Sequence, residues 1–166
     1  MTKNIVINKM VKEDWADVRD IFIEGIETRN ATFETEAPSW EIWDAGHFEE
    51  CRLVVREGEK VIGWAALSPI SDRSAHRGVA EVSIYLSSLS IGKGLGTELL
   101  QKLVECSENK GFWTLQTSIF PENQSSIRLH KKCGFAVVGV RKRLGMLDGE
   151  WRDVVILERR SKVVGL

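Results

Sequence analysis

The stretch SLSIGKGLGTELL, residues 88–100, places glycines at positions 92, 94 and 96 directly before a run of leucines. The spacing does not fit a dinucleotide-binding GxGxxG, because a glycine would be needed where Thr97 or Leu99 stands. It does not fit a phosphate loop of the GxxxxGK[ST] type either. Two interpretations remain: a plain glycine-rich turn between a strand and a helix, or an anion site made of main-chain N–H groups.

An anion site would use two properties of such a loop. Glycine lets the backbone approach a ligand closely, and the first turn of a helix exposes unpaired N–H groups that carry about half a positive charge. Lys93 would add a mobile cation. We therefore expect a phosphate group to bind at Gly92, Lys93, Gly94, Leu95, Gly96 and Thr97.

Strand and helix patterns alternate on both sides of this loop, with no repeat and no linker, so we expect one α/β domain over residues 1–166. Two polar stretches, 28–39 and 69–78, have the length of functional loops. The hydrophobic periods predict strands at 5–7, 51–57, 60–68, 79–86, 113–119, 135–143 and 151–159, and helices at 15–26, 95–110 and 123–132.

Residues 79–86 show the clearest strand pattern. Their period of two predicts one face in the core and another face that carries an acid. The core face would hold Val82, Ile84 and Leu86, and the other face Glu81, Ser83 and Tyr85.

Composition excludes several functional classes. The 23 basic and 24 acidic residues leave a formal charge of -1, which gives no general attraction for nucleic acid or an anionic membrane. The N-terminus lacks the pattern of a signal peptide, and no apolar run approaches the roughly 20 residues of a membrane span. Three cysteines without a CxxC pair argue against a zinc site or a disulfide framework. We expect a cytoplasmic protein without a metal, with Cys106 and Cys133 as small buried apolar residues.

Three motifs in this order resemble the GCN5-related N-acetyltransferase (GNAT) superfamily. They are EVSIYL at 81–86, GKGLG at 92–96 and NQSSIRLHKKCGF at 123–135. Further phrases resemble its branch of phosphinothricin and methionine sulfone or sulfoximine acetyltransferases: NATFETEAP at 30–38, GWAALSPI at 63–70 and GEWRDVV at 149–155. The resemblance covers nearly the whole chain. It implies the GNAT fold, a mixed sheet of about seven strands in which the fourth and fifth splay apart, with about four helices.

Two positions depart from the common superfamily pattern. Ile91 stands where the signature usually has glutamine or arginine, so we expect weaker cofactor affinity without its loss. His130 stands where the superfamily often has tyrosine, and the phosphinothricin branch also has histidine there.

The resemblance implies acetyl-CoA as the donor and assigns residues to it. Its pantetheine arm would pair with the backbone of Ile84, Tyr85 and Leu86, where an N–H group could stabilise the oxyanion by about 3 to 4 kcal/mol. Asn123 and Ser126 match cofactor-contacting positions. Asn123 is also an ordinary helix N-cap, and a double role is our expectation.

Direct attack of an amine on the thioester needs a base, and Glu81 is the candidate, acting through water. The alternative is a paired or solvated carboxylate. His130 would bind the acceptor or relay a proton to the departing thiolate, the alternative being a surface histidine. Neutralising an α-amine at pH 7 costs about 1.4 kcal/mol, against roughly 4.6 for lysine. This lower free-energy cost favours an α-amine as the acceptor, because a single general base can neutralise it.

The acceptor site is expected between the two long loops. Arginines there would hold the carboxylate of an amino-acid analogue, with Arg73 and Arg77 as the candidates and Arg29 beside them. Thr32, Phe33 and Trp64 would wall the pocket; the alternative for Phe33 and Trp64 is a place in the core. The resemblance also implies a homodimer. The alternatives are an acetyltransferase for a polyamine, an antibiotic or a protein N-terminus, and a non-catalytic acyl-CoA-binding module.

Overall fold

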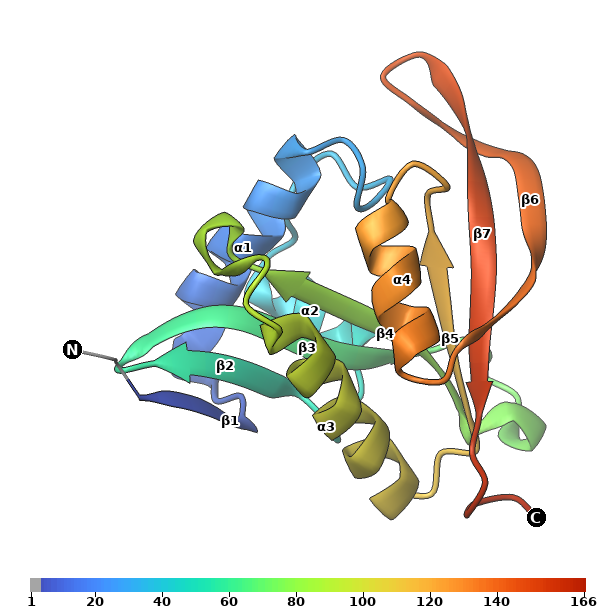
Figure 1. Cartoon of the computed structure of the whole chain (residues 1–166), viewed down its shortest axis with the longest axis horizontal. Helices are drawn as coiled ribbons and strands as arrows, with labels where there is room; N and C mark the ends of the chain where they lie inside the picture. The colour runs from blue at the N-terminus through green and yellow to red at the C-terminus, as the bar shows by residue number, and fades with distance from the viewer. Residues whose placement is uncertain (1–3) are drawn as a thin grey trace.

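The computed structural model describes residues 4–166 and contains a seven-stranded sheet in the order β1-β2-β3-β4-β5-β7-β6 (Figure 1). The strands lie within two residues of the predicted ranges, except that β6 extends four residues further towards the hairpin turn. They are β1 (Ile5–Lys9), β2 (Leu53–Glu57), β3 (Lys60–Pro69), β4 (Val79–Leu86), β5 (Thr114–Ile119), β6 (Ala136–Leu147) and β7 (Glu150–Arg160).

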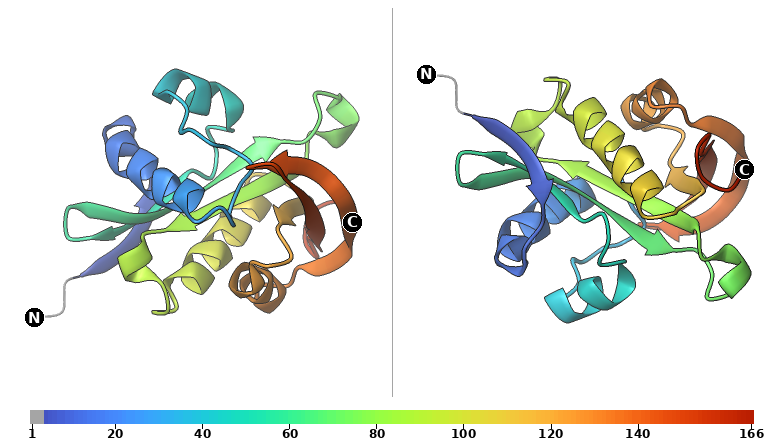
Figure 2. Two further views of the ribbon diagram at one scale, coloured as in Figure 1. Left: turned by 90° about the horizontal axis from the view of Figure 1, so that it is seen from above. Right: turned by 90° about the horizontal axis from the view of Figure 1, so that it is seen from below.

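Within residues 4–166, four α-helices cover both faces of the sheet, α1 and α2 on one face and α3 and α4 on the other (Figure 2). They are α1 (Trp15–Glu27), α2 (Trp40–Gly46), α3 (Leu95–Asn109) and α4 (Gln124–Lys132), with short 3-10 turns at Lys12–Asp14, Ser74–His76 and Ser88–Ser90. The mixed α/β class, the seven strands and the four helices agree with the expected GNAT fold.

The sequence patterns did not place α2, because its seven residues are too few for a clear apolar period. Its start has an ordinary cap: the Ser39 side chain accepts a hydrogen bond from the N–H of Ile42. Trp40 and Trp43 pack with Trp15, and Trp43 also contacts Trp64 edge to face. α2 is therefore held by aromatic contacts to α1 and the sheet.

The expectation of one buried face on β4 is corrected by the structure, because both faces carry a core. Val82 packs with the α3 side of the sheet, together with Leu99 and Leu103. On the opposite face Tyr85 stacks on Trp64, with ring centroids 5.0 Å apart, and meets Phe22 of α1 edge to face. Helix α1 covers the face that the strand pattern alone marks as polar.

The cysteines also differ from expectation. Cys51 is the buried one, whereas Cys106 and Cys133 are half-buried at the edge of the α3 core. All three are free thiols.

β4 and β5 form the one parallel pair among the strands described in residues 4–166. Their ladder has three pairs and ends at Glu81 and Gln116, although both strands continue beyond it. Residues 82–86 therefore keep a backbone edge that faces away from β3 and has no strand partner. This is the splay that the family resemblance implies.

Candidate active site

A cavity of about 800 Å³ opens where β4 and β5 diverge. Most of its walls come from four segments that are far apart in the chain: β4, the end of β5 with the start of α4, the glycine loop before α3, and the end of α1 with the loop after it. Leu144 of β6 and Val154 of β7 complete the lining. Figure 1 shows the loop after α1 reaching across towards the N-terminus of α4. The splay thus sets the place of the site.

The glycine loop lines one end of this cavity through Gly92, Gly94 and Gly96. Gly92 and Gly94 have φ of +84° and +78°, which a side chain would strain, and a Cβ at either position would meet no atom within 4 Å. Gly94 caps α3, so the first-turn N–H groups that follow it have no helical acceptor. The loop therefore offers open, unpaired backbone donors.

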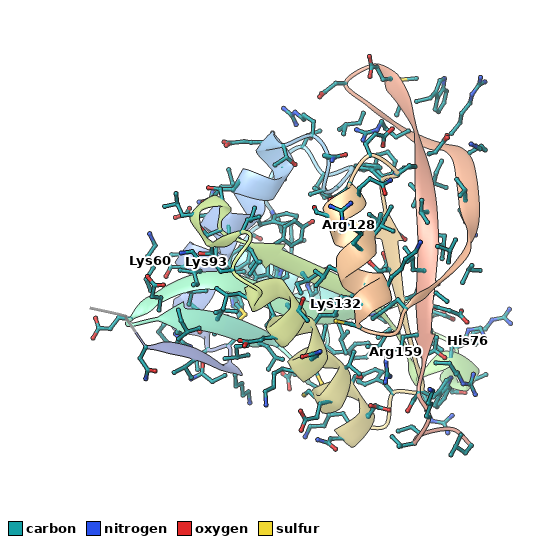
Figure 3. The ribbon with its side chains drawn as sticks, in the orientation of Figure 1. Lys60, His76, Lys93, Arg128, Lys132 and Arg159 are labelled. Atoms are coloured by element: carbon teal, nitrogen blue, oxygen red, sulfur yellow. The ribbon has the colours of Figure 1, made fainter. Side chains whose placement is uncertain are left out.

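The three other residues of the predicted anion site, and Ile91 before it, differ in placement. Thr97 lines the cavity, but Lys93 and Leu95 do not, and Leu95 packs in the core so that its backbone alone can serve a ligand. Ile91 lines the cavity and is 65% exposed. Figure 3 shows further cations on the viewer's side of the molecule, Lys93 before α3 and Arg128 on α4.

Asn123 and Ser126 both line the cavity at the start of α4. The Asn123 Oδ1 atom accepts from the N–H of Ser126 at 3.3 Å, which is the N-cap bond that the sequence predicts. The Asn123 Nδ2 atom donates to the carbonyl of Asn30 at 3.2 Å. One amide side chain therefore joins α4 to the loop after α1.

Glu81 lies on the cavity wall where the β4 and β5 ladder ends. Burial raises the pKa of its carboxyl group, and hydrogen bonds from Ser118 and Gln116 only partly oppose this. The Gln116 Nε2 atom lies 3.3 Å from Glu81 Oε2. A carboxylate of raised pKa on the wall of a cavity is suited to take up a proton.

His130 is a buried residue of the cavity floor, with 1% of its surface exposed, so it is no surface histidine. Its Nδ1 atom lies 2.8 Å from the carbonyl oxygen of Ser126, and because a carbonyl can only accept, this nitrogen carries the hydrogen. Burial lowers the pKa of the ring. The neutral ring therefore has its lone pair on Nε2, which has no hydrogen-bond partner.

The loop after α1 forms the far wall through residues 30–34. Phe33 meets Phe120 edge to face at 4.9 Å, and it lies so close to Gly145 that a Cβ there would be 2.9 Å from its ring. Burial raises the pKa of Tyr85 to about 12, while a hydrogen bond with the Thr32 side chain opposes the shift. Thr32 and Phe33 thus stand on the cavity wall.

Three predicted substrate residues are not brought to this cavity. Trp64 is 1% exposed and lies in the core behind Tyr85, so its expected place in the pocket wall is corrected. Arg73 and Arg77 are exposed, and the Arg77 guanidinium stacks 5.6 Å from the ring centre of Trp113. Neither arginine lines the cavity of its own chain.

The ionisable side chains around the cavity are mainly acidic. Glu24, Glu34 and Glu81 line it, and within residues 4–166 no lysine or arginine does. The Glu24 carboxylate accepts a hydrogen bond from the N–H of Ser88 at 2.8 Å. An anionic group bound here would therefore have to take its hydrogen bonds from backbone N–H groups, or from side chains that do not belong to the cavity lining described above.

Sequence reasoning missed three residues that shape the site. Leu144 reaches the cavity from a bulge in β6. Gly25 lets Tyr85 approach α1, since a Cβ at Gly25 would lie 2.7 Å from the ring. Arg152 contacts the loop after α1 from β7. The GEWRDVV phrase pointed to this part of β7, but contacts more than 100 residues apart along the chain leave no local pattern.

In the part of the chain that the structure covers, no cluster of three or more histidine, cysteine, aspartate or glutamate side chains is arranged to hold a metal ion. Across residues 4–166 no helix combines the length and the apolar character needed to cross a membrane.

Fold and site together are those of an acyl-CoA-dependent transferase, and the family match agrees. The model of the acetyltransferase (GNAT) family matches residues 15–135, so the chain belongs to this family and is an acetyltransferase. A Bacillus subtilis protein provisionally named a phosphinothricin acetyltransferase is 35% identical over 84% of this chain and 88% of its own. The phosphinothricin N-acetyltransferase of Alcaligenes faecalis is 30% identical over 89% of this chain and 78% of its own.

Solved structures give the same result. A GNAT superfamily phosphinothricin acetyltransferase from Sinorhizobium meliloti, in complex with acetyl-CoA, has a TM-score of 0.86 and 30% identity over 99% of this chain and 91% of its own. An acetyltransferase structure from Salmonella typhimurium with its cofactor acetyl-CoA has a TM-score of 0.86 and 25% identity over 95% of this chain and 94% of its own. The expected fold and N-acetyltransferase class are confirmed.

Proposed function

We propose that the protein transfers the acetyl group of acetyl-CoA to the α-amine of a small amino-acid analogue of the phosphinothricin or methionine sulfoximine type. One observation carries the proposal: a single cavity joins a helix start with free N–H groups, the unpaired edge of β4 and a carboxylate of raised pKa. The names of the relatives support the acceptor class.

The donor would enter along the splay. Its diphosphate would take hydrogen bonds from the backbone of residues 92–97, and the Asn123 and Ser126 side chains would border it at the start of α4. The pantetheine amides would pair with the free backbone edge of Ile84, Tyr85 and Leu86. An N–H group on this edge would then receive the negative charge of the thioester oxygen as the amine attacks.

Glu81 would act as the general base through a water molecule. The amine nitrogen forms a bond to the thioester carbon, its proton passes to the carboxylate, and the carbon–sulfur bond breaks to release the thiolate. The raised pKa of Glu81 suits this task because a more basic carboxylate holds the proton better.

His130 was expected to bind the acceptor or to relay a proton to the thiolate, and its tautomer restricts both roles. With the hydrogen held on Nδ1 by the Ser126 carbonyl, the neutral ring cannot donate from Nε2. It can accept a hydrogen bond or a proton there, and pass a proton to the thiolate only after it has accepted one. Its position in the floor of the cavity supports contact with the donor or the acceptor.

Among the residues described, 4–166, none on the cavity wall offers a cation to the carboxylate of an amino-acid acceptor. We propose that a second copy of the chain supplies it, with Arg73 and Arg77 as candidates from its exposed loop. The acidic wall also favours a second candidate function, acetylation of a polyamine, whose second ammonium group would pair with Glu34.

A homodimer is part of this proposal. Apolar side chains lie exposed along β6 and on the adjacent part of β7, among them Val138 at 60% and Trp151 at 58%. Apolar strand faces of this kind are common in interfaces between copies of one chain. The same hairpin arm carries Leu144 into the cavity, so a dimer formed there would border the acceptor site.

The test is an acetyl-CoA consumption assay with matched acceptor sets. Amino acids with sulfone, sulfoximine and phosphinate side chains should be turned over, while their decarboxylated counterparts should react more slowly by at least tenfold, since the bidentate arginine contact is lost. Preference for spermidine over every amino acid would replace the first function by the second. Binding of acetyl-CoA without turnover of any amine would make the protein a non-catalytic binding module.

Two further expectations enter the proposal. We propose that residues 1–166 work as one catalytic domain, which the continuous sheet from β1 to β6 supports. We also propose a reducing, cytoplasmic setting, in agreement with three free thiols.

A further inference from the structure

Arg152 lies on β7 beside the acceptor end of the cavity but does not line it. Its side chain is 14% exposed. In the ladder between β6 and β7, Arg152 is the partner of Gly145. The guanidinium centre stands 4.0 Å from the centre of the Phe120 ring, a stacking contact that fixes its plane.

The guanidinium donates to three acceptors. Its Nη1 atom lies 2.7 Å from the carbonyl oxygen of Arg29, and its Nη2 atom lies 3.2 Å from Asn30 Oδ1 and 3.3 Å from Glu122 Oε2. Two of these acceptors belong to the loop after α1, more than 120 positions away in the chain. A planar fork with several donors can meet this arrangement, and a lysine ammonium cannot.

Of the two loop residues that Arg152 holds, Arg29 precedes the cavity wall and Asn30 is its first residue. Arg29 has a φ of +56°, a backbone shape that a non-glycine residue keeps only when its surroundings fix it. Asn30 is also held through its own carbonyl by Asn123. The next residues, Ala31 to Glu34, line the cavity, and Phe33 rests on Gly145, the strand neighbour of Arg152.

We propose that Arg152 is a positioning residue of the acceptor site. It ties the loop at residues 29–30 to β7 and to the start of α4, and so presets Thr32 and Phe33 for the acceptor before it binds. Arg152 would therefore govern the affinity for the acceptor and leave the donor end, 88–97, untouched. The inference deepens the proposed function, because it assumes that residues 30–34 face the acceptor.

The experiment compares Arg152→Met and Arg152→Lys with Arg160→Met, a change of the same kind at an exposed position of the same strand. In Arg152→Met the KM for the acceptor should rise about tenfold or more, since small displacements of positioning groups are costly. Arg152→Lys should recover less than half of the loss. The Kd for acetyl-CoA should stay within about twofold, and Arg160→Met should match the wild type.

A second readout does not need turnover. Amide hydrogen exchange at residues 28–34 should be faster in Arg152→Met and unchanged in Arg160→Met, because the loop has lost its tie. Unchanged exchange in Arg152→Met overturns the proposal, and so does a rise in the Kd for acetyl-CoA with an unchanged acceptor KM. If the wild type acetylates no amine, the proposed function fails, while the exchange measurement still decides whether Arg152 holds the loop.

Discussion

At the scale of single residues, burial and hydrogen bonding decide what each titratable group can do. Glu81 and His130 line one cavity, and burial shifts them in opposite directions: the pKa of the acid rises and the pKa of the imidazole falls. Both shifts favour the neutral form, as a poorly hydrated environment requires. The acid must ionise to work as a base, so the pH sets its activity.

Glu81→Gln should lower kcat by about 10² to 10⁴-fold, because the amide cannot take the amine proton. The Kd for acetyl-CoA, measured by calorimetry, should change little. In the wild type kcat should fall as the pH drops through the raised pKa of Glu81, since protonation removes the base. Glu158→Gln, on the exposed side of β7, is the matched control. Full activity of Glu81→Gln from pH 6 to 9 would remove Glu81 as the base.

A second residue pair bears on stability. Burial alone would raise the pKa of Asp14, but hydrogen bonds from Arg56, with two N···O distances of 2.7 Å, and from the N–H of Val11 outweigh it, so the pKa lies below its usual value. The pair therefore stabilises the fold above the unfolded pKa of about 3.9, and this contribution is lost as the pH falls through the lower folded pKa.

Arg56→Met should lower the free energy of unfolding by about 3 kcal/mol at pH 7, because it leaves a buried carboxylate without its partner. The difference from the wild type should shrink towards pH 4, where the unpaired Asp14 becomes protonated. Urea titrations at both pH values measure it. An equal loss at the two pH values would mean that packing of the Arg56 stem, and not its charge, is responsible.

At the scale of elements, the first turn of α3 is the part on which donor binding depends. Gly94→Val should abolish acetyl-CoA binding in calorimetry, since a side chain at φ +78° strains the loop and blocks the phosphate site. Gly111 has φ +88° and equally open space at the other end of α3. Gly111→Val should lose similar stability, about 1 to 2 kcal/mol, yet bind acetyl-CoA normally. Equal binding by the two variants would place the phosphate elsewhere.

The sequence predicted the elements well where periodicity was long. Apolar residues recur at every second position in β4 and at every third or fourth position in α3, and both elements lie where expected. α2 was missed because its stability comes from tryptophans packing across α1 and β3. The role of Arg152 was missed because it also depends on contacts between distant segments. Its acceptors Arg29 and Asn30 lie on a loop without regular structure, far from β7 in the sequence.

Site residues on regular elements were easier to predict than those on loops. Glu81 follows from the alternation of β4, and Asn123 from the cap of α4. Arg73, in contrast, sits on a loop whose path no period fixes, and the structure leaves it exposed and away from its own chain's cavity. Tyr85 was placed on the polar face, because the sequence of β4 does not reveal that α1 covers it.

At the scale of the whole molecule, the exposed apolar face of β6 gives the dimer proposal its test. Val138→Asp should shift the protein to a monomer in sedimentation analysis, because a buried unpaired carboxylate opposes association. Val163→Asp, at a position 70% exposed beyond β7, is the control and should leave the assembly unchanged. A wild type that already sediments as a monomer would contradict the dimer and, with it, the arginine from a second copy.

The sheet is joined most weakly between β4 and β5. Three residue pairs join the block β1 to β4 to the block β5 to β7, while every other neighbouring pair of strands shares at least five. If the donor pairs with the free edge of β4 as proposed, it adds hydrogen bonds between the two blocks, and its binding should reduce their motion relative to each other. The weakest strand pairing of the sheet then lies beside the cavity, so the bound donor would itself reinforce the sheet where its own hydrogen bonds are fewest.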